Sequence, residues 1–424
     1  MPPRLFLIDA NNFYVASEQV FNPKLVGRPV VALSNNDGAV VSRSPEAKAL
    51  GVKMSQPWFQ LKDLVRDHGL IGLSSNYTLY ADLSNRFMSI VSEMAPTMEV
   101  YSIDECFTDH TGVPALEDQA RSIRDRIKQW VGLTVCVGCG QTKVRAKLAN
   151  HIAKTTPAHA GVFNLEALPD LQQDVLLGQI PVGEVWGVGP RTAPRLQSMG
   201  ITSVAALRDA DPKHIRSQFG VVLERIVLEL RGVPCLSLEE TRAPRKQILC
   251  SRSFGSDVVS KTELREAVLS YVANAATKLR AQKSLAGAVM VFIATSPFGA
   301  KDRYYSRSYT VAFPSPTDDT LALTRAAAAA LEHIFRDGYR YKRAGAMLLD
   351  LSPAERRQAT LFDGPDGDDR RERLNQAMDS VNARYGRGTA VVAVAGIHHR
   401  WGMKRTNLSP CYTTRWEDIV TVQS

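Results

Sequence analysis

The first 170 residues alternate between apolar runs of strand length and amphipathic helical patterns, and this alternation limits the folds open to the chain. Residues 4–9 and 133–140 are short apolar runs of the kind that form β-strands. Residues 79–95 and 117–132 instead repeat their apolar side chains at the period of a helix with one buried face. Strands that alternate with helices predict an α/β or α+β unit over residues 1–170.

Two further units are predicted downstream. Residues 171–235 contain only helical patterns, and a polar, proline-containing segment follows them. From there to about residue 352 the predicted order is strand, helix, strand, strand, helix, strand. This βαββαβ order is typical of a small sheet with two helices on one face. The 424-residue chain is therefore predicted to be an α+β protein with several domains.

The chain carries a formal net charge of +9. Such an excess suits a polyanionic partner such as nucleic acid, although a merely basic surface would give the same charge. No apolar run is long enough to span a bilayer, and the N-terminal apolar run meets Asp9 at once, unlike a signal peptide. These features favour a cytoplasmic protein that makes no membrane contact.

Three acidic residues stand at or inside predicted strands. Asp9 ends the first strand, and Asp104 and Glu105 interrupt a later strand-like run. A buried carboxylate is costly unless something compensates its charge, and clustered carboxylate oxygens suit Mg²⁺. Simple alternation would send Asp104 and Glu105 to opposite faces, so a bend or a strand end is needed there. The alternative is that these are solvated acids at a strand end.

The stretch "GVGPR" lies between two helical patterns and predicts a helix-hairpin-helix. Gly187 and Gly189 would let the backbone turn tightly, so that N–H groups at the next helix start could face a DNA phosphate. Arg191 and Arg195 could add positive charge to such a contact. An ordinary turn between two helices is the alternative.

Several ordered motifs resemble those of the Y-family of translesion DNA polymerases, and most closely its UmuC branch, the catalytic subunit of bacterial DNA polymerase V. The first set of motifs is "LIDANNFYVASEQ", "YSIDECFTD", "QTKVRAKLAN" and "VWGVGPRTAPRL". The motifs that resemble the UmuC branch include "SSNYTLYADLSNR", "LCSRSFG" and "LSPCYTTRW". Together they cover essentially the whole chain.

The resemblance implies a right-hand polymerase architecture with a palm, small fingers, a helical thumb and a βαββαβ little finger. The implied boundaries are 1–20 and 76–170 for the palm, 21–75 for the fingers, 171–235 for the thumb, 236–245 for a linker, 246–352 for the little finger and 353–424 for a C-terminal partner-binding tail.

The resemblance also implies roles for individual residues. Asp9, Asp104 and Glu105, with the main-chain carbonyl of Ala10, would bind two Mg²⁺ ions, and Tyr14 would be a steric gate against the 2′-hydroxyl of a ribonucleotide. The implied triphosphate-binding residues are Phe13, Lys48 and Lys147. The implied DNA-binding residues are Gly187, Gly189, Arg191, Arg252 and Ser253. The segment "QATLF", with Gln358, Leu361 and Phe362, resembles a sliding-clamp binding peptide.

The implied function is error-prone, template-directed DNA synthesis past lesions in an SOS-type damage response, without proofreading. The implied partners are primer-template DNA, dNTPs, a processed UmuD-type dimer, RecA and the sliding clamp, in the cytoplasm and at the nucleoid. The alternatives are a catalytically silent scaffold at stalled forks and a palm-type nucleotide cyclase. The presence of the three acids with Tyr14, Lys48 and Lys147 argues against the scaffold.

Overall fold

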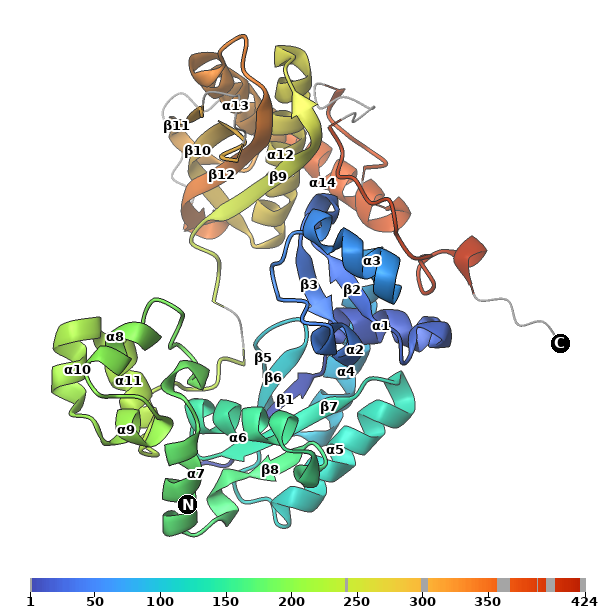
Figure 1. The fold of residues 1–424 in the computed structure, drawn as a ribbon. Coiled ribbons are helices and arrows are strands. Elements are labelled where there is room, and N and C mark those ends of the chain that lie inside the picture. The colour runs from blue at the N-terminus through green and yellow to red at the C-terminus, as the bar shows by residue number, and fades with distance from the viewer. Residues whose placement is uncertain are drawn as a thin grey trace. The chain divides into compact units, whose positions relative to one another are not determined.

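The computed structural model describes residues 2–240, 243–298, 304–356, 367–386, 388–393 and 401–419. The described chain forms two compact units. The first contains the residues before 243, except 35–37, and returns to include the residues from 407 onward. The second contains residues 35–37 and the residues from 243 to 406. Figure 1 shows the elements of both units.

A five-stranded sheet forms the centre of the first unit, in the order β5-β6-β1-β7-β8. Its strands are β1 (Leu5–Ala10), β5 (Thr97–Val100), β6 (Glu105–Asp109), β7 (Val135–Gly140) and β8 (Val162–Asn164). Neighbouring strands are antiparallel except β7 and β8, which are parallel. The bend or strand end expected at the acidic residues is present, because β5 and β6 are separate, paired strands that a bend joins.

Helices cover both faces of this sheet. The helices are α1 (Phe13–Phe21), α4 (Tyr77–Met94), α5 (Leu116–Val131) and α6 (Lys143–Thr155). Apolar side chains of α4 and α5 share one core with Phe6 and Ile8, whereas α6 packs on the opposite face, where Leu7 lies. At Gly138 an added Cβ would lie 2.1 Å from the backbone nitrogen of Asn150, so only glycine lets α6 lie this close to β7.

A smaller, three-stranded sheet lies between α1 and α4 in the chain, in the order β3-β2-β4. Its strands are β2 (Val30–Leu33), β3 (Val40–Arg43) and β4 (Ile71–Ser74), and its helices are α2 (Pro45–Ala49) and α3 (Lys62–His68). The strand β2 is fully buried between its two neighbours. The first unit continues with a helical segment, as predicted, whose members are α7 (Asp170–Gln179), α8 (Ala193–Ser198), α9 (Val204–Asp209), α10 (Pro212–Phe219) and α11 (Val221–Leu230).

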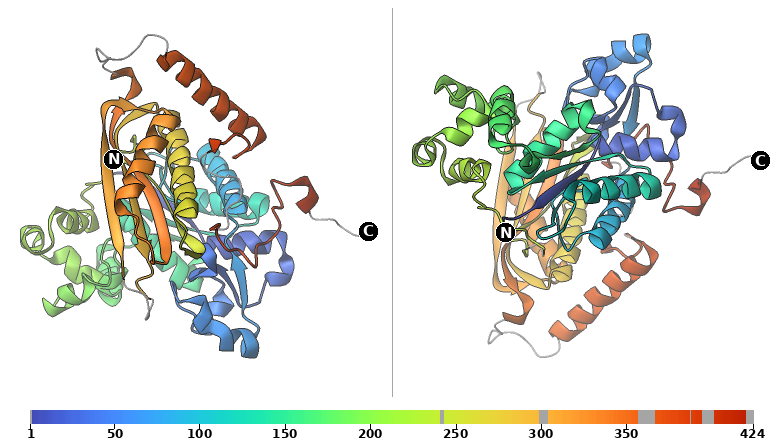
Figure 2. Two further views of the ribbon diagram at one scale, coloured as in Figure 1. Left: turned by 90° about the horizontal axis from the view of Figure 1, so that it is seen from above. Right: turned by 90° about the horizontal axis from the view of Figure 1, so that it is seen from below.

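The second unit has the predicted βαββαβ order. Its elements are β9 (Ile248–Val258), α12 (Lys261–Ala281), β10 (Ser284–Thr295), β11 (Ser306–Thr317), α13 (Thr320–Ile334) and β12 (Tyr341–Pro353). The strands form an antiparallel sheet in the order β11-β10-β12-β9. The helices α12 and α13 lie side by side on one face of it and share a core with Phe254 and Tyr341 (Figure 2).

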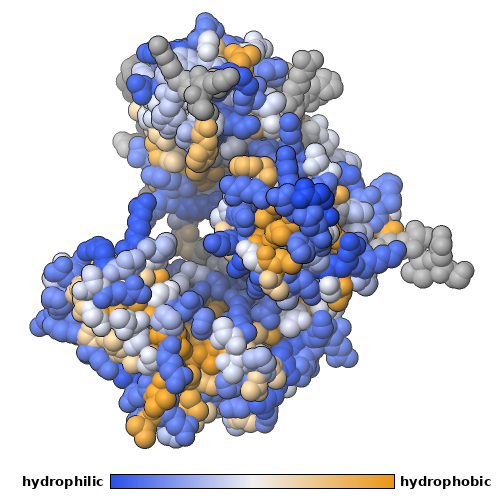
Figure 3. Space-filling view, in the orientation of Figure 1, coloured by the Kyte–Doolittle hydropathy of each residue, from blue (hydrophilic) through white to orange (hydrophobic). Residues whose placement is uncertain are grey.

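A last helix, α14 (Gly367–Tyr385), belongs to the second unit, whereas the segment from Asn407 onward belongs to the first. The face of the molecule in Figure 3 is mostly hydrophilic, with hydrophobic residues gathered in smaller patches. Within the described residues, no helix is long and apolar enough to cross a membrane.

Candidate active site

The strand register brings two of the predicted carboxylates together. Asp9, near the end of β1, is directly opposite Glu105, the first residue of β6. Both therefore face the side of the sheet that α6 covers. Asp104 lies in the bend just before β6, and its carbonyl accepts a hydrogen bond from the N–H of Ala10 at 2.8 Å. The strand end that the sequence required lies between Asp104 and Glu105.

Each carboxylate has its own partner within the protein. The ammonium group of Lys154 lies 2.6 Å from a carboxylate oxygen of Asp9, and that of Lys147 lies 3.0 Å from both oxygens of Glu105. Asp104 accepts a hydrogen bond from the hydroxyl of Ser102 at 2.6 Å. In the part of the chain that the structure describes, no group of three or more His, Cys, Asp or Glu side chains is close enough to hold a metal ion. In this arrangement α6 lysines compensate two of the acids.

The environment of Asp9 favours an additional cation. The pKa of Asp9 is raised to about 6, mainly by burial; the negative charges of Asp104 and Glu105 contribute to the rise, and Lys154 opposes it. Asp9 and Asp104 border the same cavity, so hard oxygen ligands from two strand ends face one space. Mg²⁺ prefers such ligands and commonly shares them with water and substrate phosphate. The residues present therefore fit a magnesium site.

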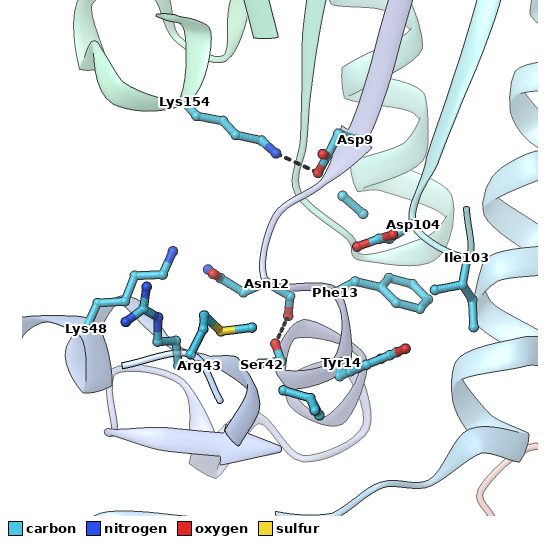
Figure 4. A pocket seen from close by; sticks show the side chains of 13 residues that line it. Asp9, Asn12, Phe13, Tyr14, Ser42, Arg43, Lys48, Ile103, Asp104 and Lys154 are labelled. Atoms are coloured by element: carbon cyan, nitrogen blue, oxygen red, sulfur yellow. Dashed lines mark hydrogen bonds and ion pairs between the residues drawn. The ribbon is translucent and has the colours of Figure 1, made fainter. Parts of the chain in front are cut away.

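The cavity that these acids border has a volume of about 430 Å³. Its lining residues are Asp9, Ala10, Asn12, Phe13, Tyr14, Val41, Ser42, Arg43, Lys48, Met54, Ile103, Asp104 and Lys154. Figure 4 shows two basic side chains that reach toward the space beside Asp9 and Asp104: Arg43 from the small sheet and Lys48 from α2. The predicted residues Asp9, Ala10, Phe13, Tyr14, Lys48 and Asp104 thus meet at one cavity, whereas Glu105 and Lys147 are not among its lining residues.

The basic side of the cavity is suited to a polyanion. Burial lowers the pKa of Lys48, and the positive charges of Arg43 and Lys154 lower it further. Cations held this close repel one another, and a phosphate chain would relieve that repulsion. The sequence prediction missed Lys154. The available signal was its position two helical turns after Lys147, which places both lysines on the same face of α6.

Lys147 has a different environment from the one predicted for a triphosphate ligand. Its ammonium group lies 4.6 Å from the ring centre of Tyr101 and 4.9 Å from that of Trp186, and it pairs with Glu105. Both the aromatic rings and the carboxylate hold the charge in this place. The structure therefore favours Lys154 over Lys147 as a phosphate-binding residue, and the role predicted for Lys147 stays a prediction.

The predicted steric gate lies at the start of α1. Asn12, which precedes this helix, has a left-handed backbone with φ of 49°, and its carbonyl accepts a hydrogen bond from Ser42 at 3.2 Å. This turn directs Phe13 and Tyr14 to the cavity. The ring of Tyr14 stacks on that of Tyr80, with centres 4.6 Å apart. Burial raises the pKa of Tyr14, and the negative charge of Asp104 adds to this effect.

The predicted helix-hairpin-helix turn depends on one of its two glycines. Gly187 has φ of +92°, and a Cβ there would lie 2.4 Å from Cδ1 of Ile226. Gly189 has no such backbone conformation, and a Cβ there would meet nothing within 4 Å. The expectation that both glycines are needed for a tight turn is therefore corrected to Gly187 alone.

The remaining predicted DNA-binding residues are on surfaces. Arg191 is exposed before α8, and Arg252 and Ser253 are exposed on β9. The carbonyl of Ser253 accepts a hydrogen bond from Asn36 at 3.1 Å. The predicted clamp-binding residues Gln358, Leu361 and Phe362 lie outside the described residues.

Comparison with known proteins gives consistent results along the chain. The sequence model of the impB/mucB/samB family matches residues 8–151, that of its C-terminal domain residues 245–361, and that of the family's helix-hairpin-helix motif residues 173–201. A domain of unknown function is matched over residues 372–422.

Relatives and solved structures agree with these matches. The chain is 45% identical to the protein UmuC of Salmonella typhimurium, over 98% of this chain and 99% of that protein. It is 28% identical to DNA polymerase IV of Desulfatibacillum aliphaticivorans, over 90% of this chain and 94% of that protein. A Y-family DNA polymerase chimera built from Dbh and Dpo4 superposes with a TM-score of 0.64 at 23% identity, covering 82% of this chain and 99% of the chimera.

The fold is that of Y-family DNA polymerases, and the relatives that match nearly the whole chain place it in this class of enzyme. Within that class the chain belongs to the impB/mucB/samB family, which includes UmuC. This membership makes it a DNA-directed DNA polymerase of the translesion type, and the predicted fold class and enzyme class are confirmed.

Proposed function

We propose that the chain carries out template-directed nucleotidyl transfer in the 430 Å³ cavity, with Asp9, Asp104 and Glu105 as ligands of two Mg²⁺ ions. The observation that carries this proposal is the meeting of Asp9 and Asp104 with Lys48, Arg43 and Lys154 around one space. When bound, the two ions would activate the primer 3′-hydroxyl and stabilise the leaving pyrophosphate.

The chain's own residues would bind and orient the nucleotide. The phosphates would be held by the positive charges of Lys48, Arg43 and Lys154. Catalysis of phosphoryl transfer depends mainly on such positioning and electrostatic stabilisation. Because Lys154 pairs with Asp9 in this structure, its ammonium group would turn from that carboxylate to a phosphate when substrate binds. The backbone N–H of Phe13 and the carbonyl of Ala10 would complete the contacts to phosphate and metal.

Tyr14 would select the sugar. Its ring lines the cavity and rests on the buried ring of Tyr80, so it cannot move away freely from a 2′-hydroxyl. A deoxyribose would pack on this ring, and a ribose would collide with it. We therefore assign discrimination against ribonucleotides to Tyr14.

The larger parts would share the remaining work of a polymerase. We assign residues 1–20 and 76–170 to the palm, 21–75 to the fingers, 171–235 to the thumb and 246–352 to the little finger, with 236–245 as a linker. DNA backbone contacts would come from the helix-hairpin-helix around Gly187, Gly189 and Arg191 and from Arg252 and Ser253. Such contacts are independent of base sequence, which suits a polymerase that accepts damaged templates.

The likeness to UmuC along nearly the whole chain supports a proposal about partners. We propose that the chain acts on primer-template DNA and dNTPs with a processed UmuD-type dimer, RecA and the sliding clamp, the last through Gln358, Leu361 and Phe362. Residues 353–424 would be the partner-binding tail. The site of action would be the cytoplasm, at the nucleoid when the protein is active.

The experiment that tests this proposal is primer extension past an abasic site with Mg²⁺ and dNTPs. The chain alone is compared with the chain plus UmuD-type dimer, RecA filament and clamp, and the clamp arm is repeated with Leu361→Ala and Phe362→Ala together. We expect bypass in the complete mixture and a loss of clamp-dependent stimulation in the double variant. Absence of bypass in every mixture, with DNA binding intact, would support the silent scaffold instead.

A further inference from the structure

The C-terminal segment from Asn407 to Tyr412 packs on the first unit, although it is more than 300 residues away in sequence from its contacts. In Figure 1 the dark red C-terminal trace runs beside the blue elements that precede α4. The segment lies within the match to a domain of unknown function. Its contacts are with α1, β4 and the start of α4.

Backbone and side-chain hydrogen bonds fix the segment at the junction of β4 and α4. The N–H of Ser74 donates to the carbonyl of Asn407 at 2.9 Å, and the N–H of Asn407 donates to the hydroxyl of Ser74 at 3.0 Å. The amide group of Asn76 donates to the Ser409 hydroxyl at 2.9 Å and to the Pro410 carbonyl at 3.1 Å. Asn76 also caps α4, because its side-chain oxygen accepts a hydrogen bond from the N–H of Leu79.

Ser409 reaches a buried acid. Its side chain acts as a hydrogen-bonding group on the carboxylate of Glu18, which is only 1% exposed, and lowers the pKa of that carboxylate. The same carboxylate accepts a hydrogen bond from the hydroxyl of Tyr80 at 2.8 Å. Tyr80 in turn is fully buried and stacks on the ring of Tyr14. A continuous set of contacts therefore runs from Ser409 through Glu18 and Tyr80 to the ring that borders the cavity.

A second contact holds the segment against α1. The rings of Tyr412 and Phe21 stack with centres 5.0 Å apart and an interplanar angle of 7°. Phe21 is the last residue of α1, and Tyr14 is near its first turn. The segment therefore contacts the far end of the helix that carries Tyr14, in addition to its contact through Glu18.

We propose that residues 407–412 are a positioning segment for the Tyr14 ring, in which Ser409 holds Glu18, Glu18 holds Tyr80, and Tyr80 supports Tyr14. The proposal rests on the sugar-selecting role assigned to Tyr14 above. It gives the C-terminal segment a part in substrate selection, although none of its residues lines the cavity.

The physical reason is the cost of a buried carboxylate. Glu18 keeps its charge in an apolar setting only with hydrogen-bond donors, and burial already raises its pKa. Without the Ser409 hydroxyl, Glu18 would have one donor fewer and would shift or take up a proton. Tyr80 would follow its acceptor, and Tyr14 would lose the flat support beneath its ring. A ring that can move by a fraction of an ångström rejects a 2′-hydroxyl less well.

The test measures the ratio of kcat/KM for a dNTP to that for the matching rNTP in primer extension by the full chain with its partners. We expect Ser409→Ala to lower this ratio about tenfold while changing kcat/KM for the dNTP much less, and Ser409→Thr, which keeps the hydroxyl, to restore it. Tyr412→Leu keeps the apolar contact with Phe21 but loses the stacking, and we expect a smaller fall in the same direction. Ser92→Ala, at a hydroxyl exposed on α4, is the matched control.

The outcomes separate this proposal from the one on which it rests. Tyr14→Ala should lower the ratio more than any other variant, and an unchanged ratio there would refute the assigned role of Tyr14 itself. If Tyr14→Ala lowers the ratio but Ser409→Ala and Tyr412→Leu leave it at the wild-type value, the positioning segment is refuted. If these variants lower dNTP and rNTP incorporation equally, the segment is only structural and the proposal is likewise overturned.

Discussion

At the scale of single residues, the site is defined by which charge compensates which. Asp9 and Glu105 are neighbours across two strands, and two lysines on one face of α6 neutralise them. The two lysines nevertheless differ in surroundings. Lys154 borders the cavity with Lys48 and Arg43, whereas Lys147 is enclosed by aromatic rings. Their substitution should therefore have different effects.

We predict that Lys154→Ala raises KM for the incoming dNTP at least tenfold, because a phosphate contact is lost. Lys147→Ala should leave KM within about threefold but lower the free energy of unfolding by about 3 kcal/mol, because Glu105 is left half-buried without its partner. Steady-state primer extension measures the first effect, and urea titration measures the second. If Lys147→Ala raised KM and Lys154→Ala lowered only stability, Lys147 would be the phosphate ligand instead.

His110 gives the first unit a dependence of stability on pH. Its ring is fully buried and stacks on Phe6, and burial lowers its pKa from 6.5 to about 4. The unfolded chain therefore binds more protons between these two pH values, so stability is lost as pH falls from 6.5 toward 4. The loss is at most roughly 3 kcal/mol.

We predict that His110→Phe, which cannot be protonated and can stack on Phe6, flattens this dependence. Urea titrations at pH 7 and pH 5 measure it, and His68→Gln on the exposed end of α3 is the control. If His110→Phe loses as much stability as the wild type between pH 7 and pH 5, another titrating group causes the pH dependence.

The sequence points to residues whose chemical type is unusual in their predicted element, such as an acid in an apolar strand. It does not reveal residues that reach the site only because two elements pack closely. A carboxylate in an apolar strand is conspicuous, so the sequence singles out Asp9, Asp104 and Glu105 as candidate metal ligands, and that role stays a prediction. A lysine on an amphipathic helix is ordinary, and only the close approach of α6 to β7 shows that Lys154 reaches Asp9.

At the scale of elements, α6 positions the site because its start is fixed. Thr142 caps this helix, accepting a hydrogen bond from the N–H of Arg145 at 3.3 Å. Its buried hydroxyl also donates to the carbonyl of Glu229 at 2.8 Å, which joins α6 to the end of α11. Periodicity predicted the helix, but this contact between distant elements has no pattern in sequence.

We predict that Thr142→Ala lowers the free energy of unfolding by about 2 kcal/mol, because it removes a cap and also the hydrogen bond that joins α6 to the carbonyl of Glu229. Thr155→Ala is the matched control at the other end of α6, where an exposed hydroxyl donates to the carbonyl of His151. The control should change stability by less than about 0.5 kcal/mol. Equal effects of the two substitutions, measured by urea titration, would argue against the cap.

At the scale of the whole molecule, the order of the elements could be predicted from sequence. The packing of the C-terminal segment back onto the first unit could not. The βαββαβ order of the second unit followed from the change of period between 2 and 3.6 along the chain. The return of residues 407–412 to α1 and β4 depends on hydrogen bonds between segments that are separated by the entire second unit. Nothing in local composition indicates such a contact.

We propose that DNA synthesis occurs in the cavity bordered by Asp9 and Asp104, and primer extension on an undamaged template measures this activity. Asp104→Asn keeps the size of the side chain and removes its charge. Asp109→Asn makes the same change at the other end of β6, where the carboxylate hydrogen-bonds to Thr111, two residues away. We predict that Asp104→Asn lowers the extension rate by roughly two to three orders of magnitude with unchanged DNA affinity, while Asp109→Asn extends like the wild type. Extension at the wild-type rate by Asp104→Asn would contradict the account.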